Sequence, residues 1–142
     1  MARKNLSLVG DEAAPKAAAA KRKRGPAAAD RIKETARDLF YREGIRAVGV
    51  DKIVSQAGVT KPSLYRSYAS KDELAVAYLQ DYAEQFWRRF EGAAARHPED
   101  VKAQFLEYLK GLGERAQHRN YRGCGISNAA VEYPERDHPA RL

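Results

Sequence analysis

The strongest constraint on the fold of this 142-residue chain is one glycine that separates two short segments with helical patterning. Apolar residues recur every three or four positions over residues 50–57, which predicts a short helix buried through Val50, Ile53, Val54 and Ala57. Gly58 is suited to the left-handed backbone that ends a helix. Thr60 is placed to cap a second helix over residues 61–68, and Pro62 is tolerated in its first turn. The two helices must therefore meet at a sharp bend.

A longer amphipathic helix is predicted just before this pair, over residues 27–43. Its apolar stripe consists of Ile32, Ala36, Leu39 and Phe40, and Gly44 supplies a left-handed stop. Two short helices joined by a glycine turn after such a helix form a helix-turn-helix. Val59 and Leu64 are expected to point inward. The second helix then presents outward side chains that suit DNA grooves and phosphates: Lys61, Ser63, Tyr65, Arg66 and Ser67.

The charge of the chain agrees with a polyanionic partner for one half only. Residues 1–71 contain 16 Lys/Arg and 7 Asp/Glu, whereas residues 72–142 contain 10 and 12, so the net charge of +7 lies in the first half. Residues 1–26 are expected to form a flexible tail that carries the basic run Lys21–Arg24. That run is interpreted as a solvated basic arm, with a nuclear-import signal as the alternative.

Helical patterning continues to the end of the chain. The capping box Ser70-Lys71-Asp72-Glu73 starts a helix that reaches residue 96. A fifth helix is predicted over residues 98–117 and a short sixth over 126–133, while the stretch from Pro134 onward is expected to be irregular. No convincing strand is found. The predicted fold class is therefore all-α, with a three-helix DNA-binding domain over residues 27–73 and a partial helical ligand-binding or regulatory domain over 74–142.

Several classes of function are excluded or disfavoured by the composition. No apolar run approaches the roughly 20 residues of a membrane span, and the start lacks a secretory signal, so a cytoplasmic protein without a membrane partner is expected. The three histidines lack metal-ligand spacing, and no cofactor or metal is expected. No catalytic triad, phosphate loop or acidic pair is found, which argues against an enzyme. Cys124 is interpreted as a buried or turn cysteine, with an oxidant-sensing thiolate as the alternative.

The run Ile53–Leu74, IVSQAGVTKPSLYRSYASKDEL, is similar to the signature of the TetR/AcrR family of bacterial regulators. In that signature an I-A-x-x-A-G-V-S/T segment leads into L-Y-x-x-F-x-S/N-K-x-x-L. The stretch ARDLFYREG and, more weakly, RGCGISNAAVEYPERDHPAR also resemble the family. The resemblance implies a repressor that a small-molecule effector releases from a palindromic double-stranded DNA operator. It also implies a homodimer, provided that the later helices of the family are supplied.

The resemblance carries roles over to named positions of this sequence. Residues matching Lys61, Pro62 and Tyr65 meet bases or the groove floor, and those matching Ser63, Ser67 and Lys71 hold phosphates. Tyr65 has a packing role as its alternative, and Tyr68 is expected to be a core residue. Two departures from the family bear on phosphate binding: Gly49 replaces a capping hydroxyl, and Asp51 places a negative charge near the second helix.

An effector pocket between the fourth and fifth helices is expected to be lined by seven residues: Tyr82, Phe86, Trp87, Phe90, Phe105, Tyr108 and Leu112. An aromatic stripe at helical spacing is more often plain core packing, which is the alternative interpretation of these residues. The alternative to a regulated repressor is a truncated, unregulated DNA-binding fragment that lacks the dimer interface.

Overall fold

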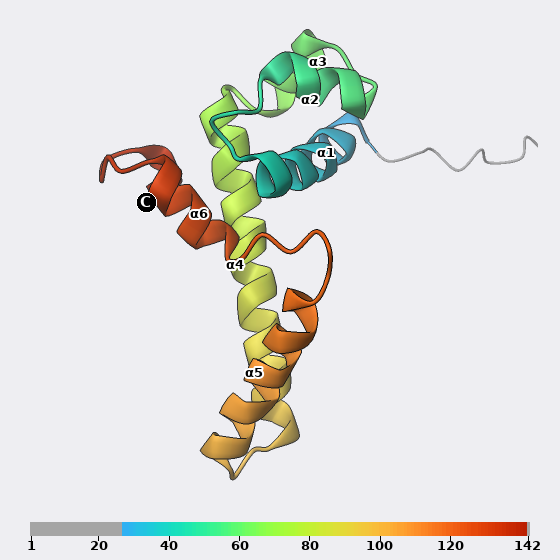
Figure 1. The fold of residues 1–142 in the computed structure, drawn as a ribbon. Coiled ribbons are helices and arrows are strands. Elements are labelled where there is room, and N and C mark those ends of the chain that lie inside the picture. The colour runs from blue at the N-terminus through green and yellow to red at the C-terminus, as the bar shows by residue number, and fades with distance from the viewer. Residues whose placement is uncertain (1–26, 142) are drawn as a thin grey trace, which may run out of the picture.

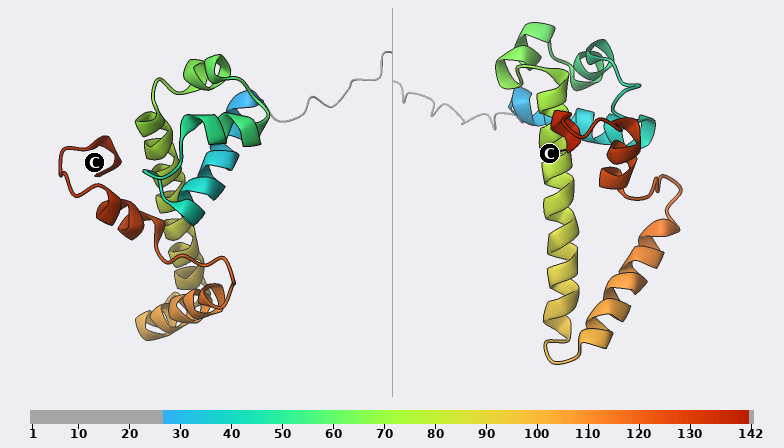
Figure 2. Two further views of the ribbon diagram at one scale, coloured as in Figure 1. Left: turned by 45° about the horizontal axis from the view of Figure 1, so that its top comes forward. Right: turned by 90° about the vertical axis from the view of Figure 1, so that its left-hand side faces the viewer.

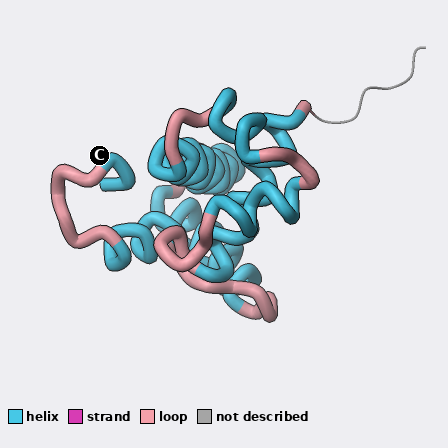
Figure 3. Tube along the Cα trace, turned by 90° about the horizontal axis from the view of Figure 1, so that it is seen from above, coloured by secondary structure: helices cyan, strands magenta, loops and turns pink. Residues whose placement is uncertain are grey.

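The computed structural model describes residues 27–141, and within them only helices and connecting loops are present (Figure 3). The elements are α1 (Ala28–Glu43), α2 (Val50–Ala57), α3 (Lys61–Ser67), α4 (Lys71–Arg96), α5 (Val101–Ala116), α6 (Gly125–Glu132) and a final turn of 3-10 helix, η1 (Pro139–Arg141). The all-α prediction is confirmed. The predicted basic tail, residues 1–26 with Lys21–Arg24, lies outside the described residues.

The long helix α4 is the axis of the molecule. Helices α1, α2 and α3 gather around its first turns, and α5 returns antiparallel along its far half (Figure 1). In the side view, α4 and α5 meet at their short connection and diverge toward the α1–α3 unit (Figure 2). Helix α6 and η1 then pack back against α4, near the α1–α3 unit.

One hydrophobic core joins α1–α3 to the start of α4. Its fully buried side chains come from all four helices and the α1–α2 loop: Ile32, Leu39, Ile45, Val48, Ile53, Leu64 and Leu74. Ala75 and Tyr78 of α4 are buried in the same cluster, and the ring of Tyr78 packs edge-on against Phe40. Because its first two turns belong to this core, α4 cannot move independently of the three helices before it.

The predicted capping box at the start of α4 is present in a slightly shifted form. The Ser70 hydroxyl accepts a hydrogen bond from the Glu73 backbone N–H at 3.1 Å. The Glu73 carboxylate accepts from the backbone N–H of Ala69 at 2.7 Å, one residue before the usual partner. These two bonds set where α4 begins.

Three local predictions are corrected by the structure. Helix α5 begins at Val101 rather than at Pro98, because the Asp100 carboxylate accepts the Ala103 N–H at 2.9 Å and so caps the helix there. The stretch after Pro134 is not irregular throughout, since η1 forms and Ala140 packs against the core. Gly44 has a positive φ of 96°, but its ψ of 147° is extended rather than left-handed helical.

Helix α5 contributes no buried residue, so its aromatic residues are not packed in a closed core. Phe105 is 53% exposed and Leu109 is 53% exposed, and Trp87 of α4 is 57% exposed beside them. The α4–α5 pair therefore keeps a large apolar face on its surface. In the part of the chain that the structure describes, no helix combines the length and apolarity needed to cross a bilayer.

Tyrosine hydroxyls hold the loop that precedes α6. The hydroxyl of Tyr41 donates to the Gly123 carbonyl at 3.0 Å and accepts from the Arg122 N–H at 2.9 Å. The Tyr82 hydroxyl donates to the same carbonyl at 3.3 Å, and its ring stacks on Tyr41. The loop is thus fastened to α1 and α4 at once.

The end of α6 is fastened to the loop between α1 and α2. The Glu132 carboxylate accepts the backbone N–H of Arg46 at 2.7 Å, while the Arg46 guanidinium donates to the Glu132 carbonyl at 3.0 Å. The same guanidinium lies over the ring of Tyr133, which stacks on His138 at 4.0 Å. The contacts of Arg46 join residues that are more than 80 positions apart in the chain.

Gly125 provides a stability test of this packing. A Cβ at Gly125 would lie 2.7 Å from the Tyr78 hydroxyl, and Tyr78 is buried and cannot turn aside. Gly125→Ala is therefore expected to lower the free energy of unfolding by about 1–3 kcal/mol, as overpacking does. Urea unfolding followed by circular dichroism measures this. The matched control is Gly113→Ala in α5, where a Cβ meets open space and helix propensity should raise stability. Equal stabilities of the two variants would contradict the close approach.

Candidate nucleic-acid interface

The bend between α2 and α3 has the geometry that its sequence predicts. Gly58 adopts φ 62° and ψ 41°, the left-handed conformation that suits glycine. The Thr60 hydroxyl accepts the Ser63 N–H at 3.3 Å and caps α3. Leu64 is completely buried and Val59 packs against the core. The opposite face of α3 is therefore turned outward.

Four residues predicted to contact DNA are exposed on this outer face of α3: Lys61, Pro62, Tyr65 and Arg66. Tyr65 is 49% exposed, and its ring stacks on no other ring in the described part of the chain. A tyrosine in this position can offer its hydroxyl to a phosphate or its ring to a thymine methyl. The geometry therefore agrees with a groove contact rather than a packing role.

Lys61 is paired with Asp51 across the bend. Its ammonium nitrogen lies 2.7 Å from the Asp51 carboxylate, and both side chains are largely exposed. The hydrogen bond and the negative charge of Asp51 raise the pKa of Lys61 above its ordinary value. In water such a pair is weak and readily exchanged. A phosphate approaching Lys61 must therefore compete with Asp51.

The serines of α3 are already engaged within the helix. The Ser63 hydroxyl accepts the Arg66 guanidinium at 2.9 Å and also contacts the Thr60 hydroxyl at 3.1 Å. Ser67 is half-buried, and its hydroxyl donates to the Ser63 carbonyl at 3.3 Å. These bonds orient Arg66 along the helix. For either serine to contact a phosphate, its hydroxyl would have to exchange or share the hydrogen bonds that it makes within the protein.

Lys71 has a structural partner that sequence reasoning did not foresee. Its ammonium donates to the Val48 carbonyl at 2.9 Å and lies 3.4 Å from the Arg46 carbonyl. It therefore stabilises the loop between α1 and α2. A lysine carries three donors, so one proton is left for a phosphate. Its phosphate role stays a prediction.

Sequence reasoning also missed Arg46, which connects the α1–α2 loop to α6 through Glu132 and Tyr133. No local pattern marks it, because its partners lie 86 and 87 positions further along the chain. Gly44 is a partial signal: a Cβ there would come within 3.1 Å of the Glu132 carboxylate. A glycine at a helix end can thus indicate a close approach as well as a turn.

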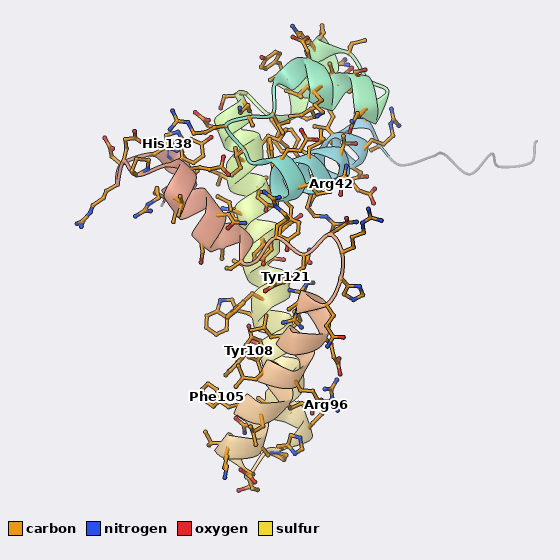
Figure 4. All side chains as sticks on the ribbon, viewed as in Figure 1. Arg42, Arg96, Phe105, Tyr108, Tyr121 and His138 are labelled. Atoms are coloured by element: carbon orange, nitrogen blue, oxygen red, sulfur yellow. The ribbon has the colours of Figure 1, made fainter. Side chains whose placement is uncertain are left out.

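The predicted effector-pocket residues do not line one common cavity in the described residues. Five of them form a chain of edge-to-face ring contacts between α4 and α5 at 5.4–6.1 Å: Phe86, Trp87, Phe90, Phe105 and Tyr108. Phe105 and Tyr108 project from one side of the helix pair (Figure 4). Tyr82 lies apart from them, stacked on Tyr41. Leu112 is half-buried on α5.

Cys124 occupies the N-cap position of α6 and is partly exposed. Burial raises the pKa of its thiol, but hydrogen bonds from Ser127, Ile126 and the Tyr82 hydroxyl outweigh this and lower the pKa below its ordinary value. Stabilisation of the thiolate is what the oxidant-sensing interpretation requires. Within residues 27–141, no cluster of three or more His, Cys, Asp or Glu side chains could hold a metal ion.

Comparison with known proteins agrees with this arrangement. Residues 32–78 match the family described as bacterial regulatory proteins, tetR family. The chain is 43% identical over 49 residues to the HTH-type transcriptional activator FasR of Mycolicibacterium smegmatis, covering 34% of this chain and 22% of FasR. It is 34% identical over 79 residues to the HTH-type transcriptional repressor KstR2 of Mycobacterium tuberculosis, covering 56% of this chain and 37% of KstR2.

Comparison with solved structures also finds a TetR-family regulator. The crystal structure of SCO4454, a TetR-family transcriptional regulator from Streptomyces coelicolor, superposes with a TM-score of 0.77 at 33% sequence identity. The superposition covers 80% of this chain and 60% of SCO4454, so the chain spans less than two thirds of each of these relatives. Residues 32–78 thus match the helix-turn-helix segment of the TetR family, and the helices that follow share the fold of a TetR-family transcriptional regulator.

Proposed function

We propose that this chain is a DNA-binding transcriptional regulator that inserts α3 into the major groove of duplex DNA. The observation that carries the proposal is the outward face of α3, where Lys61, Tyr65 and Arg66 are exposed while Leu64 is buried. A recognition helix held on a buried leucine is rigid, and cationic and aromatic side chains suit phosphates and base edges. Ser63, Ser67 and Lys71 add phosphate contacts at the rim, and Pro62 lies against the groove.

The regulator acts as a repressor that a small-molecule effector releases from its operator. The longer of the two curated matches is to a protein named as a repressor. The continuity of α4 supports release, because α4 extends from the helical hairpin with α5 into the core of the α1–α3 unit. A ligand that shifts α4 would therefore shift α3 relative to DNA. The effector site lies between α4 and α5, beside the aromatic chain from Phe86 to Tyr108.

The proposed regulator is a cytoplasmic homodimer that binds a palindromic operator. A two-fold dimer presents two recognition helices to half-sites about one helical turn apart. The exposed rings of Trp87 and Phe105 mark apolar surface that such assembly or further helices would cover.

The alternative function is an unregulated, monomeric DNA-binding fragment, which the exposed apolar face of α5 also favours. Size-exclusion chromatography with light scattering at micromolar concentration separates the two. The proposed repressor is expected to elute as a dimer, whereas a monomer that tends to associate through this face would favour the fragment. A clean dimer would instead show that the chain already contains its interface, and would remove the fragment alternative.

The main test is selection of binding sites from a random duplex library by the 142-residue chain. The proposal expects enrichment of one discrete motif, and footprinting should then show protection of that motif. Recovery of unrelated sequences, with equal affinity for selected and random duplexes, would remove the assignment of α3 as a sequence reader.

Tyr65→Ala is expected to weaken binding to the selected motif by about 1–3 kcal/mol, with little change for a scrambled duplex. The fold should be retained because Tyr65 lies outside the core. Fluorescence anisotropy with both duplexes measures the difference. Tyr65→Phe separates the hydroxyl from the ring: full loss indicates a phosphate contact, and retention indicates a ring contact. Parental affinity in Tyr65→Ala would show that this face of α3 does not meet DNA.

Asp51→Asn is expected to strengthen binding to all duplexes, because it frees Lys61 and removes a negative charge that repels phosphate. The plot of log affinity against log salt concentration should steepen by about one unit, as expected for one more neutralised phosphate. The control is Glu84→Gln, which removes the partner of Arg88 in a similarly exposed pair on α4. If both variants change the salt dependence equally, net charge rather than the Lys61 contact is responsible.

A further inference from the structure

A cleft on the α4–α5 pair has an electrostatic character opposite to that of its half of the chain. It has a volume of about 310 Å³. Five cationic side chains line it, against two glutamates: Arg88, Arg89, Arg96, Lys110 and Arg115, with Glu107 and Glu114. The lining is thus net +3, although residues 72–142 as a whole are net −2. The cleft gathers half of the Lys and Arg side chains of residues 72–142.

This cleft borders the predicted aromatic site at Tyr108, which lines it, but none of the other six residues of that site does. Arg96 projects away from Phe105 and Tyr108 in Figure 4. The helical period explains the separation, since Phe86 and Phe90 share one face of α4 while Arg89 and Arg96 share another. Gly92 and Gly111 line the cleft without side chains, which leaves it open.

Three of the five cations have no carboxylate partner in the described part of the chain. Arg96 bridges to Glu107 at 2.5 Å and Arg88 pairs with Glu84 at 3.7 Å. Arg89, Lys110 and Arg115, by contrast, have no carboxylate within 4.0 Å among residues 27–141. The Arg115 guanidinium lies close to Gly111, over the side of the cleft. Like charges held together in this way favour an anion that neutralises them.

We propose that this cleft binds a small, multiply charged oxyanion, such as a molecule with phosphate or several carboxylate groups. Guanidinium groups match these oxyanions geometrically, and charge-assisted hydrogen bonds of this kind are the strong ones. The volume fits a small molecule rather than a duplex, and the two glutamates oppose an extended polyanion. Anion binding itself does not depend on the function proposed above. Its effect on DNA binding does.

The cleft is also placed to act on the DNA-binding unit. Arg89 and Arg115 line a second cleft of about 300 Å³ together with Tyr41, Tyr82 and Tyr121. Tyr41 and Tyr82 are the residues whose hydroxyls hold the Gly123 carbonyl before α6. An anion between Arg89 and Arg115 would draw α5 toward α4 beside these hydroxyls. If the proposed function holds, it would alter the affinity for DNA.

Calorimetric titration of the 142-residue chain tests the proposal. The probes are inorganic pyrophosphate and citrate, at ionic strength held constant with sodium chloride. Saturable binding of either probe is expected, and the stronger one identifies phosphate or carboxylate as the preferred group. Lys110→Gln combined with Arg115→Gln should weaken it at least about tenfold, the equivalent of one charge-assisted hydrogen bond. The charge-matched control, Lys102→Gln with Arg119→Gln, lies outside the cleft and should bind as the parent does.

A steric pair of variants gives a second, charge-independent test. Gly92→Leu fills the cleft, while Gly113→Leu adds the same side chain to an exposed helical position outside it. Both glycines have open space for a Cβ, so both variants should fold, and circular dichroism checks this. Only Gly92→Leu should lose the probe.

Three results would overturn the proposal: no saturable heat with either probe, equal weakening in cleft and control variants, or loss of DNA binding in the cleft variants without any probe present. The last would assign the cations to DNA instead. The calorimetric titration contains no DNA, so it tests anion binding separately from DNA binding. If the chain binds the probe but selects no DNA motif, only the proposed function is rejected.

Discussion

The structure depends on the insertion of the first turns of α4 into the core of the helix-turn-helix. Leu74 and Ala75 are fully buried there, and Tyr78 packs edge-on against Phe40 of α1. Burial of a leucine side chain such as Leu74 contributes about 1.5–3 kcal/mol, more than an exposed ion pair on the surface. Helix α3 is therefore attached rigidly to the 26-residue helix α4. A change at the far end of α4 reaches α3 without any need for a flexible hinge between them.

A second connection joins the chain after α5 back to α1, α4 and the α1–α2 loop. The loop before α6 is held by the hydroxyls of Tyr41 and Tyr82, and the end of α6 is held by the paired contacts of Arg46 and Glu132. Helix α6 thus touches the DNA-binding unit at its first and last turns. Neither attachment depends on a buried charge, so both can open at modest cost. The fold combines one rigid attachment through α4 with one adjustable attachment through α6.

The features that could be predicted from sequence are those that depend on residues close together in the chain. The bend at Gly58, the cap at Thr60 and the start of α4 at Ser70 each depend on side chains within four positions of the backbone that they organise. The predicted start of α5 at Pro98 was wrong. A proline is permitted in the first turn of a helix, but the hydrogen bond to the Asp100 carboxylate sets the actual start at Val101. Contacts across the fold gave no local signal. Lys71 therefore looked like a free phosphate ligand, although the Val48 carbonyl, 23 positions earlier, accepts a hydrogen bond from it.

The candidate effector region shows the same limit in another form. Helical spacing correctly indicated that Phe86, Phe90 and Tyr108 meet, but it could not distinguish a cavity from rings packed on one another. The charged face of the same helices is more informative about a ligand than the aromatic residues are. Cations gather on that face although residues 72–142 as a whole have a negative net charge. Mutual repulsion between Arg89 of α4 and Arg115 of α5 opposes closure of the two helices, which diverge toward the DNA-binding unit (Figure 2). An anion between them would remove that repulsion, and the rigid attachment of α4 would carry the resulting shift to α3.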